Sequence, residues 1–296
     1  PFKSILVVGL GLIGGSILKD LKKLKVLNKV FGVDLDKKIV SKAFELNLIR
    51  NKDNNLDKMG EDTLVIFSVP SLSFEAAYNS LHNLLPYEKV TLTDTMSSKG
   101  NLIDFLRSNK QVKGDFIFSH PIAGSEKSGL SNSLPSLFKN KLVVISPFEN
   151  SNEDSLVKLN TFWAKLGSKV SILDFEIHDK IFSNTSHLPH ILSFALMDYL
   201  EKKLSKEVFK YSGGSLEDYT RIASSDPVMW RDILLSNKKE LLNSIEGFRS
   251  SLDEIYDLIE SGDRKLYQRL THKTQNREWF ASVLHALATE LAASGM

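Results

Sequence analysis

Short apolar runs alternate with helix-like segments over the first part of the chain, from Ser4 to about Asp174. The runs are rich in β-branched and aromatic residues and lie within ILVVGL, KVFGVDL, TLVIFSV, KVTLTD, DFIFSH, KLVVISP and KVSIL. Alternation of this kind predicts βα units that build a largely parallel sheet with helices on both faces. We therefore predict an α/β fold with a doubly wound sheet over residues 1–174.

The pattern changes beyond Asp174, where apolar residues recur at helical spacing. The segments are LPHILSFALMDYLEKKL, MWRDILLSNKKELLNSIEGFRSSLDEIYDLIESG and REWFASVLHALATEL, and their period predicts an all-helical second module over residues 175–296. These amphipathic helices carry more apolar positions than a small bundle needs for its own core. The excess predicts burial against a second subunit, and hence a homodimer.

Composition narrows the class of protein. A chain of 296 residues fits two domains better than one core, and 38 basic against 36 acidic residues leave a net charge of +2, which gives no footprint for nucleic acid. The absence of cysteine excludes disulfides and thiol chemistry and fits a reducing compartment. Because neither a signal peptide nor a membrane-length apolar run is recognisable, we expect a soluble cytoplasmic protein without a membrane partner.

A glycine-rich motif follows the first predicted strand and opens a helix. In a G-x-G-x-x-G sequence, the first glycine permits a tight turn, the second lets the backbone approach a pyrophosphate, and the third lets helix and strand pack closely. The helix N-terminus favours the phosphate charge. The predicted cofactor-binding residues are Gly9, Leu10, Gly11, Leu12, Ile13 and Gly14.

Asp34 ends the second predicted strand, twenty residues after Gly14. An acid at this position accepts hydrogen bonds from an adenosine ribose and repels a 2′-phosphate, which predicts NAD over NADP, although Lys37 and Lys38 follow closely. The alternative is a glycine turn beside an aspartate that caps the next helix. After the third strand, Ser68, Val69 and Pro70 are expected to form a wall of the cofactor site; the alternative is a proline that merely ends a strand.

Two loops beyond the cofactor motifs carry candidate catalytic residues. Oxidation of a carbinol needs a proton acceptor with a pKa near working pH, and His120 is our choice. Ser97, in the loop after the preceding strand, is expected to bind the same hydroxyl or to orient the imidazole. Ser125 follows in the His120 loop as a candidate substrate-binding residue. The alternatives are a loop histidine that bonds to backbone and, for Ser97, a helix N-cap.

Polar residues also crowd the start of the helical module. His178, Asp179, Ser183, His187 and His190 lie on an otherwise apolar segment, and such polar density in a core-facing helix asks for an explanation. Further along, Arg221 could hold a carboxylate bidentately. Each of these residues alone would more often serve packing or capping. A metal site is a weaker alternative because few carboxylates lie nearby, and we predict none.

Taken together, these motifs resemble those of the prephenate dehydrogenase (TyrA) family. The motifs are GLGLIGGS, the acid of FGVDLD, SVP, DTMSSKG, HPIAGSEKSG, SHLPH and DYTRIASSDPVMWRDI, and they occur in the family's order from about Ile5 to Asp232. The resemblance implies a Rossmann-type NAD-binding domain followed by a helical substrate-binding and dimerisation domain. It also implies NAD-dependent oxidative decarboxylation of prephenate to 4-hydroxyphenylpyruvate, in tyrosine biosynthesis.

The resemblance also implies roles for single residues. His120 would accept the proton of the ring hydroxyl with help from Ser97, while Ser183 and His187 line the substrate site and Arg221 binds a substrate carboxylate. Glu126, Asp218 and Trp230 match positions around the mouth of the pocket, part of which comes from the partner subunit in similar dimers.

One departure is Met96, which stands where many relatives have a glycine before the serine. Three other functions remain open at this point. They are arogenate dehydrogenase on the same framework, a noncatalytic NAD-sensing protein, and a β-hydroxyacid dehydrogenase. The last typically uses a catalytic lysine in its helical domain, and the HPIAGSEKSG and TRIASSDP runs argue against it.

Overall fold

The computed structural model describes residues 1–26, 30–53, 56, 59, 62–81, 90–109, 112, 114–124, 127–204, 210–266 and 268–270. The chain divides into two compact units, Pro1–Lys238 and Lys239–Met296. The predicted boundary between modules at residue 174 falls inside the first unit and stays a prediction. The helix expected in REWFASVLHALATEL lies outside the described residues.

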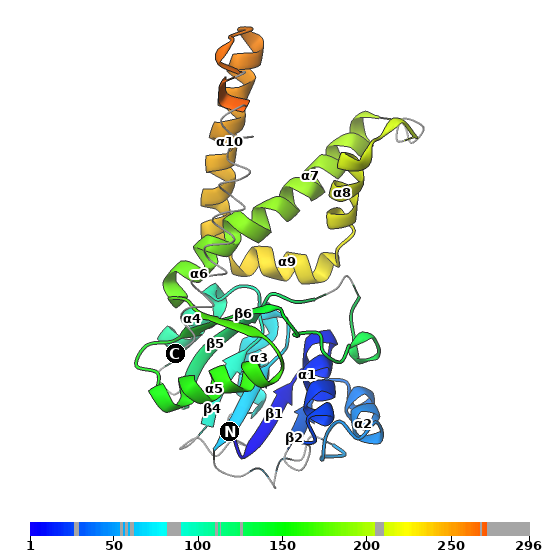
Figure 1. Ribbon diagram of the computed structural model, residues 1–296, viewed down its shortest axis with the longest axis vertical. Helices are drawn as coiled ribbons and strands as arrows, with labels where there is room; N and C mark the ends of the chain where they lie inside the picture. Colours follow the sequence, from blue (N-terminus) through cyan, green and yellow to red (C-terminus); the bar gives the residue numbers. More distant parts are fainter. Residues whose placement is uncertain are drawn as a thin grey trace. The chain divides into compact units, whose positions relative to one another are not determined.

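All seven predicted strands are present and form one sheet (Figure 1). They are β1 (Ser4–Val8), β2 (Val30–Val33), β3 (Thr63–Phe67), β4 (Val90–Asp94), β5 (Asp115–Pro121), β6 (Leu142–Pro147) and β7 (Lys169–Ile172). The order is β2-β1-β3-β4-β5-β6-β7, and only the β5–β6 pair is antiparallel. The prediction of a largely parallel, doubly wound sheet is confirmed.

Helices cover both faces of this sheet. They are α1 (Leu12–Lys23), α2 (Lys37–Glu45), α3 (Phe74–Leu81), α4 (Gly100–Ser108) and α5 (Glu153–Lys165). Along β1, Ile5 and Val7 join the core beneath α1, α2 and α5, whereas Leu6 and Val8 join the core beneath α3 and α4. Side chains alternate between the faces of a strand, so a strand buried on both sides must be apolar throughout.

The described residues after β7 form helices and no strand, which confirms the predicted change of class. The elements are α6 (Phe175–Phe182), the π-helical turn η5 (Ser183–His187), α7 (Leu188–Lys203), α8 (Gly214–Ala223), α9 (Pro227–Ser236) and α10 (Lys238–Glu260). Helix α6 begins where it does because the Asp174 side chain accepts a hydrogen bond from the Glu176 amide. None of the described helices combines the length and apolar character that crossing a membrane requires.

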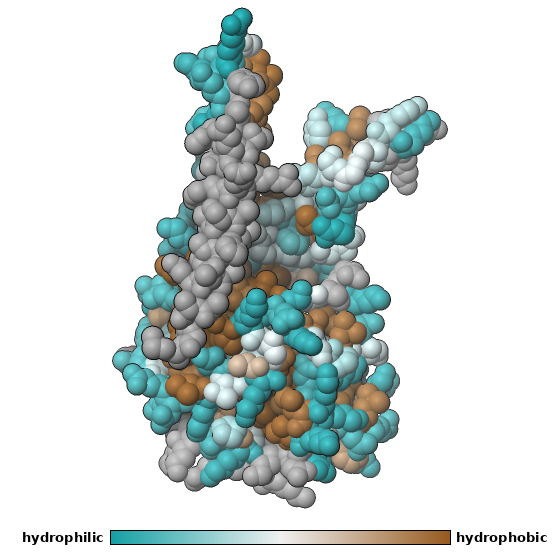
Figure 2. All heavy atoms as spheres, in the orientation of Figure 1, coloured by the Kyte–Doolittle hydropathy of each residue, from teal (hydrophilic) through white to brown (hydrophobic). Residues whose placement is uncertain are grey.

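The described part of the second unit, considered by itself, is mainly α10. Its apolar side chains recur at helical spacing and include Leu252, Tyr256 and Ile259, which are 52%, 61% and 62% exposed. Figure 2 shows hydrophobic side chains along the upper part of this helix. Large apolar side chains repeated along one helix are typical of a surface that another chain covers.

The strand order reverses at β1, which lies between β2 and β3. In open α/β sheets, ligands bind in the crevice at such a reversal, beyond the carboxyl ends of the strands. The loops after β1 and β3 flank this crevice, and the loops after β4 and β5 continue along the same edge. The topology therefore places the glycine motif, the SVP turn, the Ser97 loop and the His120 loop along one side of the sheet.

Candidate active site

The glycine turn after β1 is shaped by close backbone approach. Gly9 has φ of +88°, and a Cβ there would lie 2.6 Å from the Ser68 carbonyl oxygen, so a side chain at this position would be strained. A Cβ on Gly14 would lie 2.1 Å from the Gly9 carbonyl oxygen. Gly11, in contrast, has open space within 4 Å of its Cβ position. Gly9 and Gly14 therefore pack directly against backbone atoms, whereas the space beside Gly11 is open, as the approach of a pyrophosphate requires.

The N-terminus of α1 completes this part of the site. Gly11 is its N-cap and has no side chain to accept a hydrogen bond from the first amides of the helix. Leu12 is buried and Ile13 packs against the core, so both hold the helix on the sheet. Because the first amide groups of a helix lack partners within it and carry partial positive charge, this end fits a dinucleotide phosphate.

Asp34 is tied to the glycine turn. One of its oxygens accepts a hydrogen bond from the Leu10 amide at 2.8 Å and the other from the Asp36 amide at 3.0 Å. The N-cap of α2 is Asp36, whose side chain accepts from Lys38. The alternative in which Asp34 caps the next helix is therefore wrong. Its carboxylate lies beside the glycine turn, and its contact with a ribose stays a prediction.

The residues after β3 lie against the same turn. The Ser68 amide donates to the Val8 carbonyl at 2.7 Å, and the Ser68 hydroxyl accepts from Thr95 at 3.2 Å. A Cβ on Gly9 would lie 2.9 Å from Val69. Pro70 ends this segment as the N-cap of a short 3-10 turn. Ser68 and Val69 thus adjoin the glycine turn, as expected of a cofactor wall.

A buried ion pair organises the ends of β4 and β5. Asp94 and Lys99 are both 0% exposed, and the Lys99 ammonium donates to the Asp94 carboxylate and to the carbonyls of Met96 at 2.8 Å and Ser119 at 2.7 Å. Asp94 also accepts from the amides of Met96 at 2.9 Å and Ser119 at 3.1 Å. Burial lowers the pKa of Lys99 and raises that of Asp94, and their mutual attraction opposes both shifts.

This ion pair brings the two predicted catalytic residues to adjoining points. One ammonium bonds to the residue before Ser97 and to the residue before His120. Met96 is buried, packs in the core and does not have a positive φ, so this loop does not require glycine there. The N-cap of α4 is Lys99, so the alternative of Ser97 as the N-cap is wrong. The Ser97 hydroxyl forms no hydrogen bond within the described part of the chain.

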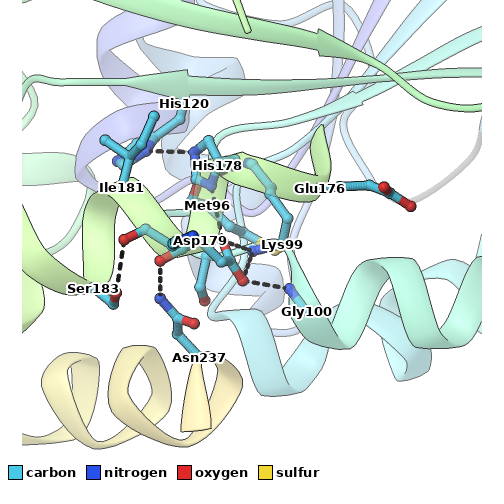
Figure 3. A network of polar contacts seen from close by, with 12 residues as sticks. Met96, Lys99, Gly100, His120, Glu176, His178, Asp179, Ile181, Ser183 and Asn237 are labelled. Atoms are coloured by element: carbon cyan, nitrogen blue, oxygen red, sulfur yellow. Dashed lines mark hydrogen bonds and ion pairs between the residues drawn. The ribbon is translucent and has the colours of Figure 1, made fainter. Parts of the chain in front are cut away.

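His120 begins a chain of buried polar contacts (Figure 3). Its Nδ1 lies 3.0 Å from His178 Nε2, and His178 Nδ1 lies 2.8 Å from Asp179 Oδ1. The Asp179 carboxylate accepts from the Lys99 amide at 2.8 and 3.0 Å and from the Gly100 amide at 2.8 Å. Helix α6 is thereby anchored at the N-terminus of α4, and through it His120 is held at the edge of the sheet.

Burial sets the protonation of these histidines. It lowers the pKa of His120 well below 6.5, and positive charge on His178, Lys99 and His187 acts in the same direction. Burial also lowers the pKa of His178 well below 6.5. The Phe182 ring lies 4.4 and 4.5 Å from the two imidazoles and keeps water from one side. Both rings are therefore neutral at neutral pH.

Asn237 connects Asp179 with His187, which is predicted to line the substrate site. The Asn237 side-chain amide donates to the Asp179 carbonyl at 2.8 Å and lies 3.0 Å from His187 Nδ1. His187 is 0% exposed, and burial lowers its pKa to about 4. Two buried ring nitrogens, His187 Nε2 and Trp230 Nε1, lack a partner among the described residues, and these rings lie 6.1 Å apart.

Of the remaining predicted substrate residues, Ser183 lies near this network (Figure 3), whereas Arg221 and Asp218 lie on α8. Ser183 is buried, and its hydroxyl donates to the Lys180 carbonyl at 2.8 Å. Arg221 and Asp218 form an exposed pair, 3.4 Å apart, on α8. Neither Arg221 nor Asp218 contacts His120 within the described residues. Ser125 and Glu126 lie outside the described residues.

Several residues of this network were not assigned a role from the sequence. Asp94 and Lys99 lie in the DTMSSKG loop, and the adjacent His178 and Asp179 were noted only as polar crowding. Asn237 gave no sequence signal, since an asparagine after a helix is an ordinary C-cap. No cluster of three His, Asp or Glu side chains suited to a metal occurs in the described part of the chain.

Both halves of the chain match models of one protein family. Residues 17–172 match the prephenate dehydrogenase nucleotide-binding domain, and residues 174–273 match the prephenate dehydrogenase dimerization domain.

Individual relatives agree with this match. The chain is 35% identical over 267 residues to the prephenate dehydrogenase of Lactococcus lactis subsp. cremoris, covering 86% of this chain and 70% of the relative. It is 30% identical over 266 residues to the cyclohexadienyl dehydrogenase of Zymomonas mobilis, covering 88% and 90%. The crystal structure of Aquifex aeolicus prephenate dehydrogenase with hydroxyphenyl propionate and NAD+ has a TM-score of 0.84 and 34% identity, covering 95% and 99%.

We predict that Lys99→Met lowers the free energy of unfolding by about 3–5 kcal/mol, because it leaves the buried Asp94 carboxylate without its counter-charge. Chemical denaturation measures this value. Arg107→Ala is the matched control, since Arg107 pairs with Glu149 and Glu176 on the surface and its loss should change stability by less than about 1 kcal/mol. Equal effects of the two substitutions would contradict the assigned role of Lys99.

Proposed function

The chain belongs to the prephenate dehydrogenase family, and from this membership we propose that it converts prephenate to 4-hydroxyphenylpyruvate in tyrosine biosynthesis, with NAD as cofactor. The observation that supports the proposal most directly is His120. It lies on the strand beside the Ser97 loop, is neutral at neutral pH, and its Nε2 forms no hydrogen bond within the described residues. A neutral imidazole nitrogen at the carboxyl edge of a nucleotide-binding sheet is in the protonation state that accepts a proton from a carbinol, although its pKa lies below the value near working pH expected from the sequence.

Proton acceptance by His120 would accompany oxidation of the ring carbinol. NAD, when bound, supplies the acceptor for the hydride that leaves the carbinol carbon. His120 Nε2 takes the hydroxyl proton in the same step, and the ring carboxylate departs as carbon dioxide while the ring becomes aromatic. The proton then returns to the phenolic oxygen, which regenerates the neutral base. The contribution of the chain is to position the hydroxyl and to accept and return its proton.

The other roles in the site are assigned as follows. Ser97, with a hydroxyl that no described residue engages, would bond to the substrate hydroxyl or to the imidazole. His187 and Ser183 would line the substrate pocket, and Arg221 would hold a substrate carboxylate. The exposure of Arg221 on α8 is compatible with a pocket that is completed by a second subunit.

Asp218 and Trp230 would lie around the mouth of that pocket, together with Ser125 and Glu126 from outside the described residues. We assign the dimer to the helical module because its matched family model is a dimerization domain and because α10 carries exposed apolar side chains. We also propose residues 1–174 as the nucleotide-binding domain and 175–296 as the helical domain. The cytoplasmic location expected from the sequence stays a prediction.

The assay that tests the function measures NADH formation from prephenate by the full-length protein. We expect turnover with prephenate at a kcat/KM at least about tenfold above that with arogenate. Arogenate is the second candidate, because the Zymomonas mobilis relative is named for a cyclohexadienyl ring, which the two substrates share. Preference for arogenate would replace the proposed substrate, and binding of NAD with turnover of neither would identify a noncatalytic protein.

Substitutions separate the role of the proton acceptor from that of the carboxylate ligand. His120→Asn should lower kcat roughly 10²–10⁴-fold with the Kd for NAD unchanged. Arg221→Ala should chiefly raise the KM for prephenate, by roughly 10–100-fold. Arg249→Ala is the matched control, since Arg249 forms an exposed i,i+3 pair with Glu246 just as Arg221 does with Asp218. The reverse pattern of kcat and KM effects would overturn both assignments.

The pH profile of kcat/KM follows from the lowered pKa of His120. Only the neutral imidazole accepts a proton, so activity is full above the His120 pKa and is lost as pH falls through it. Because burial and the neighbouring His178, Lys99 and His187 lower that pKa well below 6.5, the acidic limb should lie well below pH 6.5. Steady-state rates from about pH 4 to about pH 8 test this position. A limb centred at or above 6.5 would contradict the buried position of the base.

A further inference from the structure

A single buried residue, Asp179, connects His120, the proposed proton acceptor, with His187, which is assigned to the substrate site. The Asp179 carboxylate bonds to His178, which contacts His120, and the Asp179 backbone carbonyl accepts from Asn237 (Figure 3). The same Asn237 nitrogen contacts His187. Asp179 is 7% exposed and Asn237 3%. Both branches therefore run through the protein interior, where the donor and acceptor at each step are set by the protein.

The carboxylate branch determines which nitrogen of His120 carries a proton. Among the described residues, the Asp179 oxygens face N–H groups alone, those of Lys99, Gly100 and His178, so they act as acceptors. His178 is neutral and has one ring proton, which must lie on Nδ1 to face the carboxylate. His178 Nε2 is then an acceptor, and the His120 nitrogen 3.0 Å from it, Nδ1, must be the donor. The lone pair of His120 is left on Nε2.

The carbonyl branch gives His187 the opposite arrangement. A backbone carbonyl only accepts, so the atom of Asn237 that faces the Asp179 oxygen is the amide nitrogen. The same nitrogen faces His187 Nδ1 at 3.0 Å, so this ring nitrogen is the acceptor and carries no proton. The single proton of the neutral ring lies on Nε2, the buried atom that has no partner among the described residues.

We propose that Asp179 fixes the two histidines in opposite tautomers, with His178 and Asn237 as positioning residues. His120 presents a lone pair at Nε2, and His187 presents an N–H at the same ring position. On the proposed function, on which this role rests, His120 accepts the hydroxyl proton. His187 Nε2–H, with the unpartnered Trp230 Nε1–H beside it, donates to a substrate carboxylate oxygen. Buried donors without acceptors are uncommon in folded proteins, and an anionic oxygen satisfies them.

Nitrogen NMR of the full-length protein labelled with 15N-histidine tests the tautomers directly. Protonated and unprotonated ring nitrogens resonate far apart, and the spectra of His120→Asn and His187→Asn assign the signals. We expect a protonated Nδ1 for His120 and a protonated Nε2 for His187. The same tautomer in both rings, or a proton on Nε2 of His120, would overturn the proposal. This measurement needs no substrate, so its result is independent of whether the protein oxidises prephenate.

Substitution of His178 tests the first branch. His178→Leu removes the acceptor for His120 Nδ1–H and should lower kcat by at least about tenfold, as the loss of an orienting group does in a catalytic triad. His178→Gln offers a carbonyl oxygen at similar reach and should restore part of the rate and the protonated Nδ1 signal of His120. Near-UV circular dichroism checks that both variants fold. If the kcat of folded His178→Gln is no higher than that of folded His178→Leu, His178 does not position His120.

Substitution of Asn237 tests the second branch. Asn237→Asp replaces the N–H donor with an acceptor, so the proton of His187 should move to Nδ1 and the KM for prephenate should rise at least about tenfold, with a smaller change in kcat. Ser236→Ala is the matched control, because Ser236 is buried at the same helix end and its hydroxyl bonds to Asn101. An unchanged His187 tautomer in Asn237→Asp, or an equal rise in KM in Ser236→Ala, would overturn the role of Asn237.

Discussion

The hydrogen bonds from the first amides of α4 to the Asp179 carboxylate are the contact on which the arrangement of the site depends. A helix N-terminus leaves amide groups without intrahelical partners and carries partial positive charge. In α4 no side chain of the helix itself satisfies them, and the acceptor comes from α6, 79 to 80 residues further along the chain. The amides at the N-terminus of α4 are therefore satisfied by a tertiary contact instead of a local cap, and this contact holds α6 at the edge of the sheet.

The Asp94–Lys99 pair makes this edge polar at its centre. Burying two charges costs more than their attraction returns unless every proton and lone pair is engaged. Here the Lys99 ammonium reaches one carboxylate and two carbonyls, and Asp94 accepts two further amide hydrogen bonds. A pair of this kind contributes specificity of geometry more than stability. Both carbonyls belong to residues that precede the predicted catalytic side chains, so the geometry that it specifies is that of Ser97 and His120.

The sheet could be predicted from the sequence because each buried strand is a separate apolar run between polar or glycine-rich segments. The glycine turn could also be predicted from the sequence, since a Cβ at Gly9 or Gly14 would clash with backbone atoms and glycine is required there. His120 and Ser97 could be singled out as candidates because the proposed chemistry needs a proton acceptor and a hydroxyl after adjacent strands. Arg221 could be singled out by residue type, but its exposed position on α8 depends on packing that no local pattern reports.

The sequence did not reveal the buried residues that position other side chains by hydrogen bonds. Asn237 looks like a helix-ending asparagine, and its importance arises only because Asp179, 58 positions earlier, turns its carbonyl toward it. His178 beside Asp179 is an unremarkable pair until α6 packs on the N-terminus of α4. The π-helical turn Ser183–His187 was also missed, because an extra residue in a helical turn leaves the apolar period nearly unchanged. Such contacts follow from the tertiary fold and not from local composition.

Burial lowers the pKa values of the histidines of this site, so that each ring is neutral at neutral pH. In water an imidazole near neutral pH is a mixture of a cation and two neutral tautomers, and none of these is dominant enough to serve one role. Desolvation lowers the pKa values of His120, His178 and His187, which leaves only the choice between tautomers. That choice requires little energy and can be made by a single fixed neighbour for each ring. A protein that needs one imidazole as acceptor and another as donor can therefore use the same side chain twice, provided that the first ring faces an acceptor, as His120 faces His178 Nε2, and the second faces a donor, as His187 faces the Asn237 amide.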